Sequence, residues 1–175
     1  TTSRIGPGGN FDIILTKFNA AGDGLLGSVV IGGTGNDGVN IRPKYSQPQG
    51  ADGIRRNYGD DARSEVILDG GGNVILASCT QSTDFPIAGG AIQSTFGGGR
   101  QDGVILKFNS NLSSYIFGNF FGGSGDDAAY SVAFGLDSSI YVVGGTASTD
   151  FPVPGLGLQK TYGGGLTDGW IYHIN

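Results

Sequence analysis

The chain contains no methionine, one cysteine, one histidine and one tryptophan, and Glu65 is the single glutamate among its fifteen acidic residues. One cysteine excludes an internal disulfide, and Cys79 follows the apolar residues Val74–Ala77, so we expect a buried small side chain there. One cysteine and one histidine leave no cluster of these residues for zinc. No apolar run reaches the roughly 18 residues of a membrane-spanning helix, so no membrane insertion is expected.

Charge is also scarce, at 14% of residues, and it is unbalanced, with a net charge of −5. A negative chain is poorly suited to general binding of nucleic acid or of an anionic membrane, so neither partner is expected. Disordered chains combine high charge with few aromatics, whereas 10% of the residues here are aromatic. The composition therefore indicates a folded protein.

Glycine is abundant, at 35 of 175 residues, but it does not recur at every third position, which excludes a collagen helix. A folded chain with this much glycine contains many tight turns. The simplest interpretation is an all-β fold.

An internal repeat is the main signal in the sequence. Residues 60–109 align without a gap with residues 126–175, and the identities cluster in Asp-Asp-Ala, Ser-Thr-Asp-Phe-Pro and Gly-Gly-Gly motifs. Residues 11–19 and 32–37 repeat 101–109 and 122–127, so the N-terminal stretch is the second half of the same unit. The two matched segments are further apart in the chain here than in the match between residues 60–109 and 126–175, which indicates an insertion within the first crossover.

Each full unit is predicted to form four short strands, because apolar segments alternate with turns rich in Gly, Asp, Asn and Ser, and no segment has helical spacing. The predicted strands are, in the order of the unit: first, 64–68 and 130–134; second, 74–80 and 140–146; third, 13–19, 103–109 and 169–175; fourth, 25–31 and 115–121.

Four antiparallel strands followed by a Gly-rich crossover are typical of a β-propeller blade. The nine strands amount to about two and a quarter blades. We predict, in chain order: 1–37, the second half of a blade; 38–59, an inserted loop; 60–125, a complete blade; 126–175, the first three strands of the next. A ring needs roughly four to eight blades, so we expect either a segment of a longer propeller, which we favour, or a ring completed by several chains. A β-solenoid is the structural alternative, although its coils are usually shorter than this repeat.

The motifs resemble those of the bacterial SBBP repeats, a family named for a seven-bladed β-propeller. The resemblance rests on Gly-Gly-Ser-Gly-Asp-Asp at 122–127, Ser-Thr-Asp-Phe-Pro at 82–86 and 148–152, Thr-Tyr-Gly-Gly-Gly at 161–165, and the Asp-Gly third strand that ends in Phe-Asn. It implies a large secreted or surface-exposed bacterial protein with many blades, often beside adhesion-type modules, and it supplies no shared reaction or catalytic residues. The insertion and the incomplete strand count depart from the family pattern.

The repeated acidic pairs have two interpretations. The side chains of Asp60, Asp61, Asp126 and Asp127 either accept backbone N–H bonds and hold a tight crossover, or each pair binds one Ca²⁺ together with nearby carbonyls. Ca²⁺ is the only cofactor that the sequence suggests.

The insertion differs in composition from the rest of the chain, because it carries four of the ten basic residues, two tyrosines and a single acid. A basic, aromatic loop on an acidic protein is suited to contact an acidic polymer or a partner protein. It is equally suited to be a solvated or blade-covering loop. The candidate partner-binding residues are Arg42, Lys44, Tyr45, Arg55, Arg56 and Tyr58.

Catalysis finds little support. His173 replaces Lys17 and Lys107 in the third strand, which predicts an outward-facing residue, and no Gly-x-Ser-x-Gly motif occurs. Phe85, Phe151 and Trp170 are expected to pack between blades. The sequence thus predicts a non-catalytic, secreted or cell-surface scaffold that contacts other blades or subunits and a protein or glycan partner. The alternatives are a carbohydrate-binding, lectin-like propeller completed by oligomerisation and, third, an enzyme acting on polysaccharides.

Overall fold

The computed structural model describes residues 2–39, 41, 64–155 and 157–175, and the candidate partner-binding residues of the insertion lie outside these ranges. Within the described ranges the chain forms ten strands in three sheets and no helix, so no helix there could cross a membrane. The predicted all-β fold is confirmed.

The central sheet has the order of the predicted repeat unit. It consists of four antiparallel strands that are neighbours in both sequence and space: β4 (Glu65–Leu68), β5 (Val74–Thr80), β6 (Asp102–Phe108) and β7 (Tyr115–Phe121). The β4–β5 turn forms because Asp69 Oδ1 accepts hydrogen bonds from the N–H groups of Gly71 and Asn73, both at 2.9 Å. Such an Asx turn is the expected result of an Asp followed by glycines.

The C-terminal sheet contains the first three strands of the next unit. These are β8 (Asp127–Phe134), β9 (Ile140–Thr146) and β10 (Asp168–Ile174), paired antiparallel in the order β8-β9-β10. β8 begins three residues before its predicted start, at the second residue of the acidic pair.

The N-terminal sheet contains the predicted β2 (Ile13–Phe18) and β3 (Leu25–Ile31), together with β1 (Thr2–Ile5), which the sequence did not predict. β1 pairs in parallel with the outer edge of β3. In the repeat alignment β1 corresponds to residues 92–95 of the central unit. The loop that contains these residues lies along β7, where the N–H of Phe120 donates to the carbonyl of Gln93 at 3.0 Å. The segment before the third strand therefore covers the exposed edge of the fourth strand in both sheets, which protects that edge from pairing with another chain.

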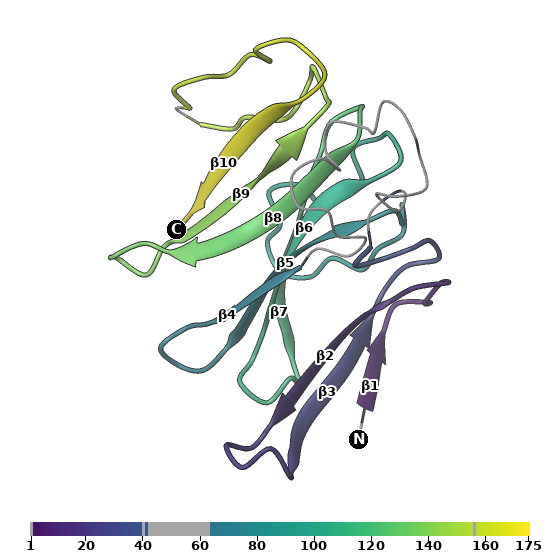
Figure 1. Cartoon of the computed structure of the whole chain (residues 1–175), viewed down its shortest axis with the longest axis vertical. Coiled ribbons are helices and arrows are strands. Elements are labelled where there is room, and N and C mark those ends of the chain that lie inside the picture. The colour runs from purple at the N-terminus through teal and green to yellow at the C-terminus, as the bar shows by residue number, and fades with distance from the viewer. Residues whose placement is uncertain (1, 40, 42–63, 156) are drawn as a thin grey trace.

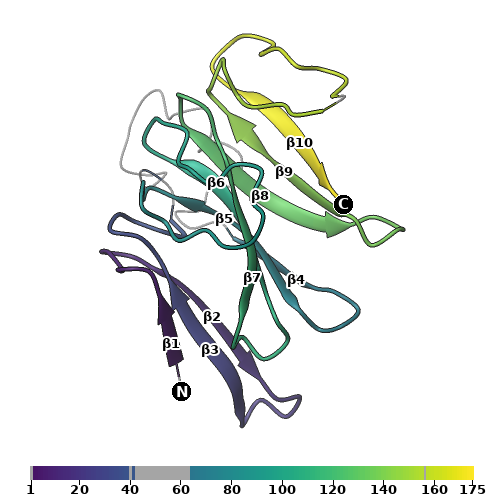
Figure 2. The same cartoon turned by 180° about the vertical axis from the view of Figure 1, so that it is seen from behind.

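The three sheets follow one another along the long axis of the molecule, with the central sheet in the middle (Figures 1 and 2). Side chains from the N-terminal and central sheets form one apolar core, and side chains from the central and C-terminal sheets form a second. Every residue of β5 is buried because apolar cores cover both faces of the central sheet. Each fully buried Ile, Leu or Phe stabilises such a stack by roughly 1.5–3 kcal/mol.

Three large aromatic side chains lie between the sheets, as predicted. Phe85 is only 4% exposed and packs edge-on against Phe120. Trp170 is 8% exposed, stacks on Phe151 at 5.3 Å and contacts Phe121 at 5.0 Å across the second core. Cys79 is buried as expected, with its thiol 3.7 Å from the carbonyl of Ala129.

Candidate functional site

The repeated motifs meet at the junctions between sheets. A crossover follows the fourth strand of one sheet, at residues 32–37 after β3 and 122–127 after β7, and leads to the next sheet. The Ser-Thr-Asp-Phe-Pro motif follows the second strand of that next sheet, at 82–86 and 148–152. Each crossover is hydrogen-bonded to the motif that lies beside it, as the contacts below show.

In the first copy, polar side chains of the motif bind the backbone of the crossover. Asp84 Oδ1 accepts hydrogen bonds from the N–H of Thr34 at 2.8 Å and from its hydroxyl at 3.1 Å. Ser82 Oγ accepts from the N–H of Gly35 at 2.9 Å. The crossover is thus attached to the following sheet by residues 47 and 50 positions further along the chain.

Asp37, the last residue of this crossover, points inward and closes the arrangement. Its Oδ2 accepts from the N–H of Gly33 at 2.8 Å and from Ser82 Oγ at 3.0 Å, while the hydroxyl of Thr80 donates to Oδ1. Ser82 therefore accepts from the crossover backbone and donates to the crossover carboxylate, so both of its hydrogen-bonding functions are used between the sheets.

The second copy repeats these contacts except for the bond from Thr80, whose counterpart Thr146 donates to the carbonyl of Ser148 at 3.4 Å. We call each copy an inter-sheet clamp. The matching contacts are Ser124 N–H and Oγ to Asp150 Oδ1, both 2.8 Å; Gly125 N–H to Ser148 Oγ, 2.8 Å; Gly123 N–H to Asp127 Oδ2, 2.8 Å; and Ser148 Oγ to Asp127 Oδ2, 2.6 Å. Two independent sequence segments thus form one geometry, which indicates that the repeated motifs encode the joint between sheets.

The two residues of the acidic pair do different things. Asp127 is fully buried in the clamp, whereas Asp126 accepts hydrogen bonds from the N–H and guanidinium of Arg100, with which it forms an ion pair. Asp60 and Asp61 lie outside the described residues. Among the residues that are described, no group of three His, Cys, Asp or Glu side chains is placed to hold a metal ion.

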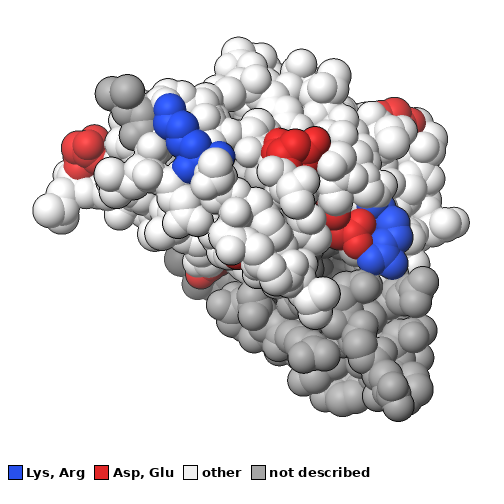
Figure 3. Space-filling view, turned by 90° about the horizontal axis from the view of Figure 1, so that it is seen from above, with Lys and Arg blue, Asp and Glu red and all other residues white. Residues whose placement is uncertain are grey.

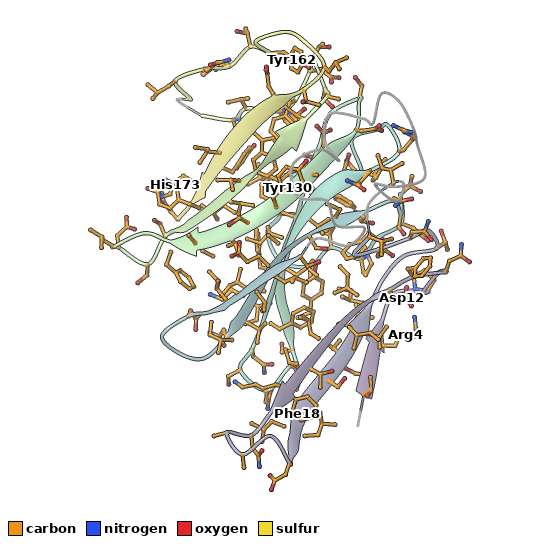
Figure 4. The ribbon with its side chains drawn as sticks, in the orientation of Figure 1. Arg4, Asp12, Phe18, Tyr130, Tyr162 and His173 are labelled. Carbon is orange, nitrogen blue, oxygen red and sulfur yellow. The ribbon has the colours of Figure 1, made fainter. Side chains whose placement is uncertain are left out.

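A second carboxylate approaches each clamp from the start of the third strand. Asp102 Oδ2 accepts from the N–H of Gly97 at 2.6 Å, and its carboxylate fills the space that a Cβ atom on Gly122 would need. In the first copy, Asp12 occupies this position beside Gly32, and Figure 4 shows it next to Arg4, to which it is bound at 2.8 Å. Gly32 and Gly122 therefore leave room for carboxylates.

Burial sets the protonation of these groups. The pKa of Asp102 is raised to about 8, mainly by loss of solvation and also by the negative charges of Asp127 and Asp126, against the opposing effect of the hydrogen bond from Gly97. Burial also raises the pKa of Asp37 and Asp127. Oδ1 of Asp102 and Oδ1 of Asp127 have no hydrogen-bond partner among the described residues, and a neutral carboxyl makes such an atom less costly to bury.

Stability is expected to fall as the pH rises from about 5 to about 8. The carboxyl of Asp102 has a pKa near 4 in the unfolded chain and about 8 in the folded chain. Its contribution to the free energy of unfolding is therefore fully present below the unfolded pKa and is lost as the pH rises through the folded pKa. We expect the free energy of unfolding to drop by about 3–4 kcal/mol over this range. Urea unfolding at several pH values measures the drop.

The Asp102→Asn variant should show less than half of that drop, because asparagine does not titrate. Asp69 does not interfere, since its hydrogen bonds to Asn73 hold its pKa at about 2, below this range. Asp168→Asn is the matched control at the same position of the next, partly exposed third strand, and its pH profile should parallel that of the unmodified chain. Parallel profiles for Asp102→Asn and the unmodified chain would contradict the assignment.

His173 lies on the exposed side of β10 and stacks on Tyr141 with ring centroids 4.6 Å apart. The nearby Ser139 donates its hydroxyl to Asp137 at 2.5 Å, which leaves that proton engaged with a carboxylate rather than with the imidazole. A nucleophilic serine instead needs its hydroxyl bonded to the base.

Charged groups are few and scattered among uncharged residues on the face shown in Figure 3. The part of this face formed by the described residues therefore has no large region of one sign that would attract a polyanion or a polycation.

No protein-family model matches the chain, and no curated protein shows significant sequence similarity to it. The roles of these residues therefore rest on their geometry. Sequence reasoning missed Thr80, Ser82, Asp84 and their counterparts in the next repeat as partners of the crossover. The signal was present, since both the Ser-Thr-Asp-Phe-Pro motif and the Gly-Gly-Ser/Thr-Gly crossover recur in the sequence, although the insertion makes their separation longer in the first copy than in the second.

Proposed function

We propose that the chain is a non-catalytic repeat segment of a β-propeller-type protein, secreted or exposed at a bacterial cell surface, that acts as a scaffold for protein or glycan contacts. The repetition of the clamp carries this proposal. Asp127, a candidate Ca²⁺ ligand in the sequence, is hydrogen-bonded to Gly123 and Ser148, and Asp37 makes the same hydrogen bonds to Gly33 and Ser82 at the preceding junction. An active site would need one differentiated copy, whereas a structural joint repeats its main contacts.

Further blades, from a longer chain or from other subunits, would complete a ring under this proposal. Three blade-like sheets are fewer than the roughly four to eight of a closed propeller. The stack offers an apolar surface for such neighbours, because Ile14 on the N-terminal sheet and Ile171 on the C-terminal sheet are 65% and 74% exposed. Their counterparts in the central sheet, Val104 and Ile105, are completely buried.

A binding and turnover screen tests the proposal. The chain is immobilised and exposed to a glycan array, to polygalacturonate as an acidic polymer and to neutral dextran, and separately incubated with glycosidase, lyase and esterase substrates. Scaffold function predicts binding without turnover. Turnover that His173→Ala abolishes would overturn the proposal, and saturable binding of a defined oligosaccharide would favour the lectin alternative. The double variant Arg55→Ala, Arg56→Ala should weaken binding to the acidic polymer and leave the melting temperature unchanged.

A further inference from the structure

The C-terminal sheet has a groove at the position where the other two sheets hold a fourth strand. In the N-terminal sheet β3 lies between β2 and β1, and in the central sheet β7 lies between β6 and the loop that contains Ala88 and Gln93. In the C-terminal sheet, β10 and the matching loop instead border a groove of about 470 Å³. Figure 4 places Tyr162 on this loop, and the groove is lined among others by Phe151, Val153, Gln159, Tyr162, Trp170 and Tyr172.

The counterparts of these lining residues in the central sheet all surround β7. Phe85 and Phe96, which correspond to Phe151 and Tyr162, both pack edge-on against Phe120 of β7, with centroids 6.3 and 6.1 Å away. The N–H of Gly118 in β7 donates to the carbonyl of Ala88 at 2.8 Å. The residues that line the groove thus correspond to residues that surround the fourth strand in the central sheet.

Gln159 is already oriented for such a strand. Its counterpart Gln93 donates through Nε2 to the carbonyl of Thr95 at 3.1 Å and also brackets Gly122, the residue after β7, by donating to its carbonyl at 2.9 Å and accepting from its N–H at 3.3 Å. Gln159 makes the first of these bonds, to the carbonyl of Thr161 at 3.2 Å, and is otherwise exposed.

We propose that the groove beside β10 is a strand-acceptor site that binds an extended segment of the fourth-strand type of this repeat, apolar at alternate positions and followed by Gly-Gly. This proposal rests on the proposed role of the chain as a repeat segment. The β3 sequence fits better than that of β7. It carries the smaller Val30 where β7 carries Phe120, which suits a groove that already contains the bulky Trp170. It also lacks a hydroxyl like that of Tyr115, which donates to the carbonyl of Pro86. The equivalent carbonyl in the C-terminal sheet, that of Pro152, already accepts a hydrogen bond from Tyr172.

Trp170 is the single tryptophan and lines the groove, so its fluorescence reports binding directly. The probe is a capped peptide with the sequence of residues 25–33, Leu-Leu-Gly-Ser-Val-Val-Ile-Gly-Gly. We expect a saturable blue shift with a Kd below about 100 µM, typical of strand addition supported by apolar pockets. A peptide with proline at the positions of Val29 and Val30 loses one N–H towards each edge and should bind at least 10-fold more weakly.

Two variants of the full chain sharpen the test. Gln159→Ala removes the side-chain amide that is expected to hydrogen-bond the Gly-Gly end of the peptide. It should weaken peptide binding about 5-fold, the effect of losing about one net hydrogen bond. Leu166→Ala is the matched control and should bind within twofold of the unmodified chain. Leu166 lies on the same loop, is 77% exposed and does not line the groove.

Equal binding of both peptides, no binding of either, or an unchanged affinity of Gln159→Ala would overturn the proposal. So would a concentration-dependent shift of Trp170 without peptide, which would identify a second copy as the occupant, or displacement of the shift by an oligosaccharide, which would identify a sugar site. Failure of the peptide together with binding and no turnover in the array screen would remove the strand site and leave the scaffold function intact.

Discussion

Replacing Asp127 by alanine is expected to lower the free energy of unfolding by about 3 kcal/mol, whereas the same replacement of its neighbour Asp126 should cost about 1 kcal/mol or less. Asp127→Ala leaves the N–H of Gly123 and the hydroxyl of Ser148 buried without their acceptor. Asp126→Ala removes an ion pair with Arg100, a side chain that is 43% exposed and accessible to water. Urea unfolding of both variants, with circular dichroism as the signal, measures the difference.

Equal costs for the two variants would contradict the inter-sheet clamp, because a pair of ligands to one Ca²⁺ would be lost by either substitution. The metal alternative also has a separate test. Melting the unmodified chain in EDTA and then in excess Ca²⁺ should give the same midpoint if the clamp is complete without metal. A rise of several degrees with Ca²⁺ would restore the calcium interpretation of the acidic pairs.

Gly122→Ala is the second substitution for which we expect a large loss, about 2–3 kcal/mol, which is the cost of forcing extra atoms into a packed interior. The new methyl group would overlap the carboxylate of Asp102, and Gly122 is itself buried. Since Gly122 does not have a positive φ, the penalty comes from this overlap alone. Thermal and urea unfolding measure it.

Gly70→Ala is the matched control, because a Cβ on Gly70 meets nothing within 4 Å and this glycine also lacks a positive φ. Its stability should stay within about 0.5 kcal/mol of the unmodified chain. The double variant Gly122→Ala, Asp102→Ala should lose less than the sum of its single variants, because truncating Asp102 makes room for the methyl group. Equal losses for Gly122→Ala and Gly70→Ala would show that Asp102 does not occupy the position described.

The strands were predictable because each is bounded by residues that favour turns. Asp69 and the glycines after it end one strand and begin the next, and a repeated sequence gives each boundary more than once. β1 escaped prediction because Thr2–Ile5 has no apolar alternation. Its place depends on parallel pairing with β3, a contact between segments 26 residues apart.

The inter-sheet clamp was predictable only in part. The sequence suggested that the Asp-Asp crossover accepts backbone hydrogen bonds, and Asp127 does so. The pairing of Thr34 with Asp84 across 50 residues depends on how two sheets stack, which strand periodicity does not specify. The different roles of Asp126 and Asp127 do follow from a simple rule, since successive residues at the start of a strand point to opposite sides.

The fold and the proposed function are connected through these joints. Each sheet is too small to bury both of its faces alone, so stability comes from stacking, as in other repeat proteins. The clamp fixes how one sheet follows the next, and it does so with residues that recur in each unit. The loop beside β10 is largely exposed and lies outside these joints, so it could take part in the proposed contacts with partners.

A double-mutant cycle on Asp127 and Ser148 is the most direct test of the central claim that these repeated polar residues join the sheets. The free energies of unfolding of Asp127→Ala, Ser148→Ala and the double variant are compared with that of the unmodified chain. The structure predicts a coupling of at least about 1 kcal/mol, as expected for a buried hydrogen-bonded pair. Costs that add to within about 0.3 kcal/mol would show that the two side chains act independently, and the inter-sheet clamp would be wrong.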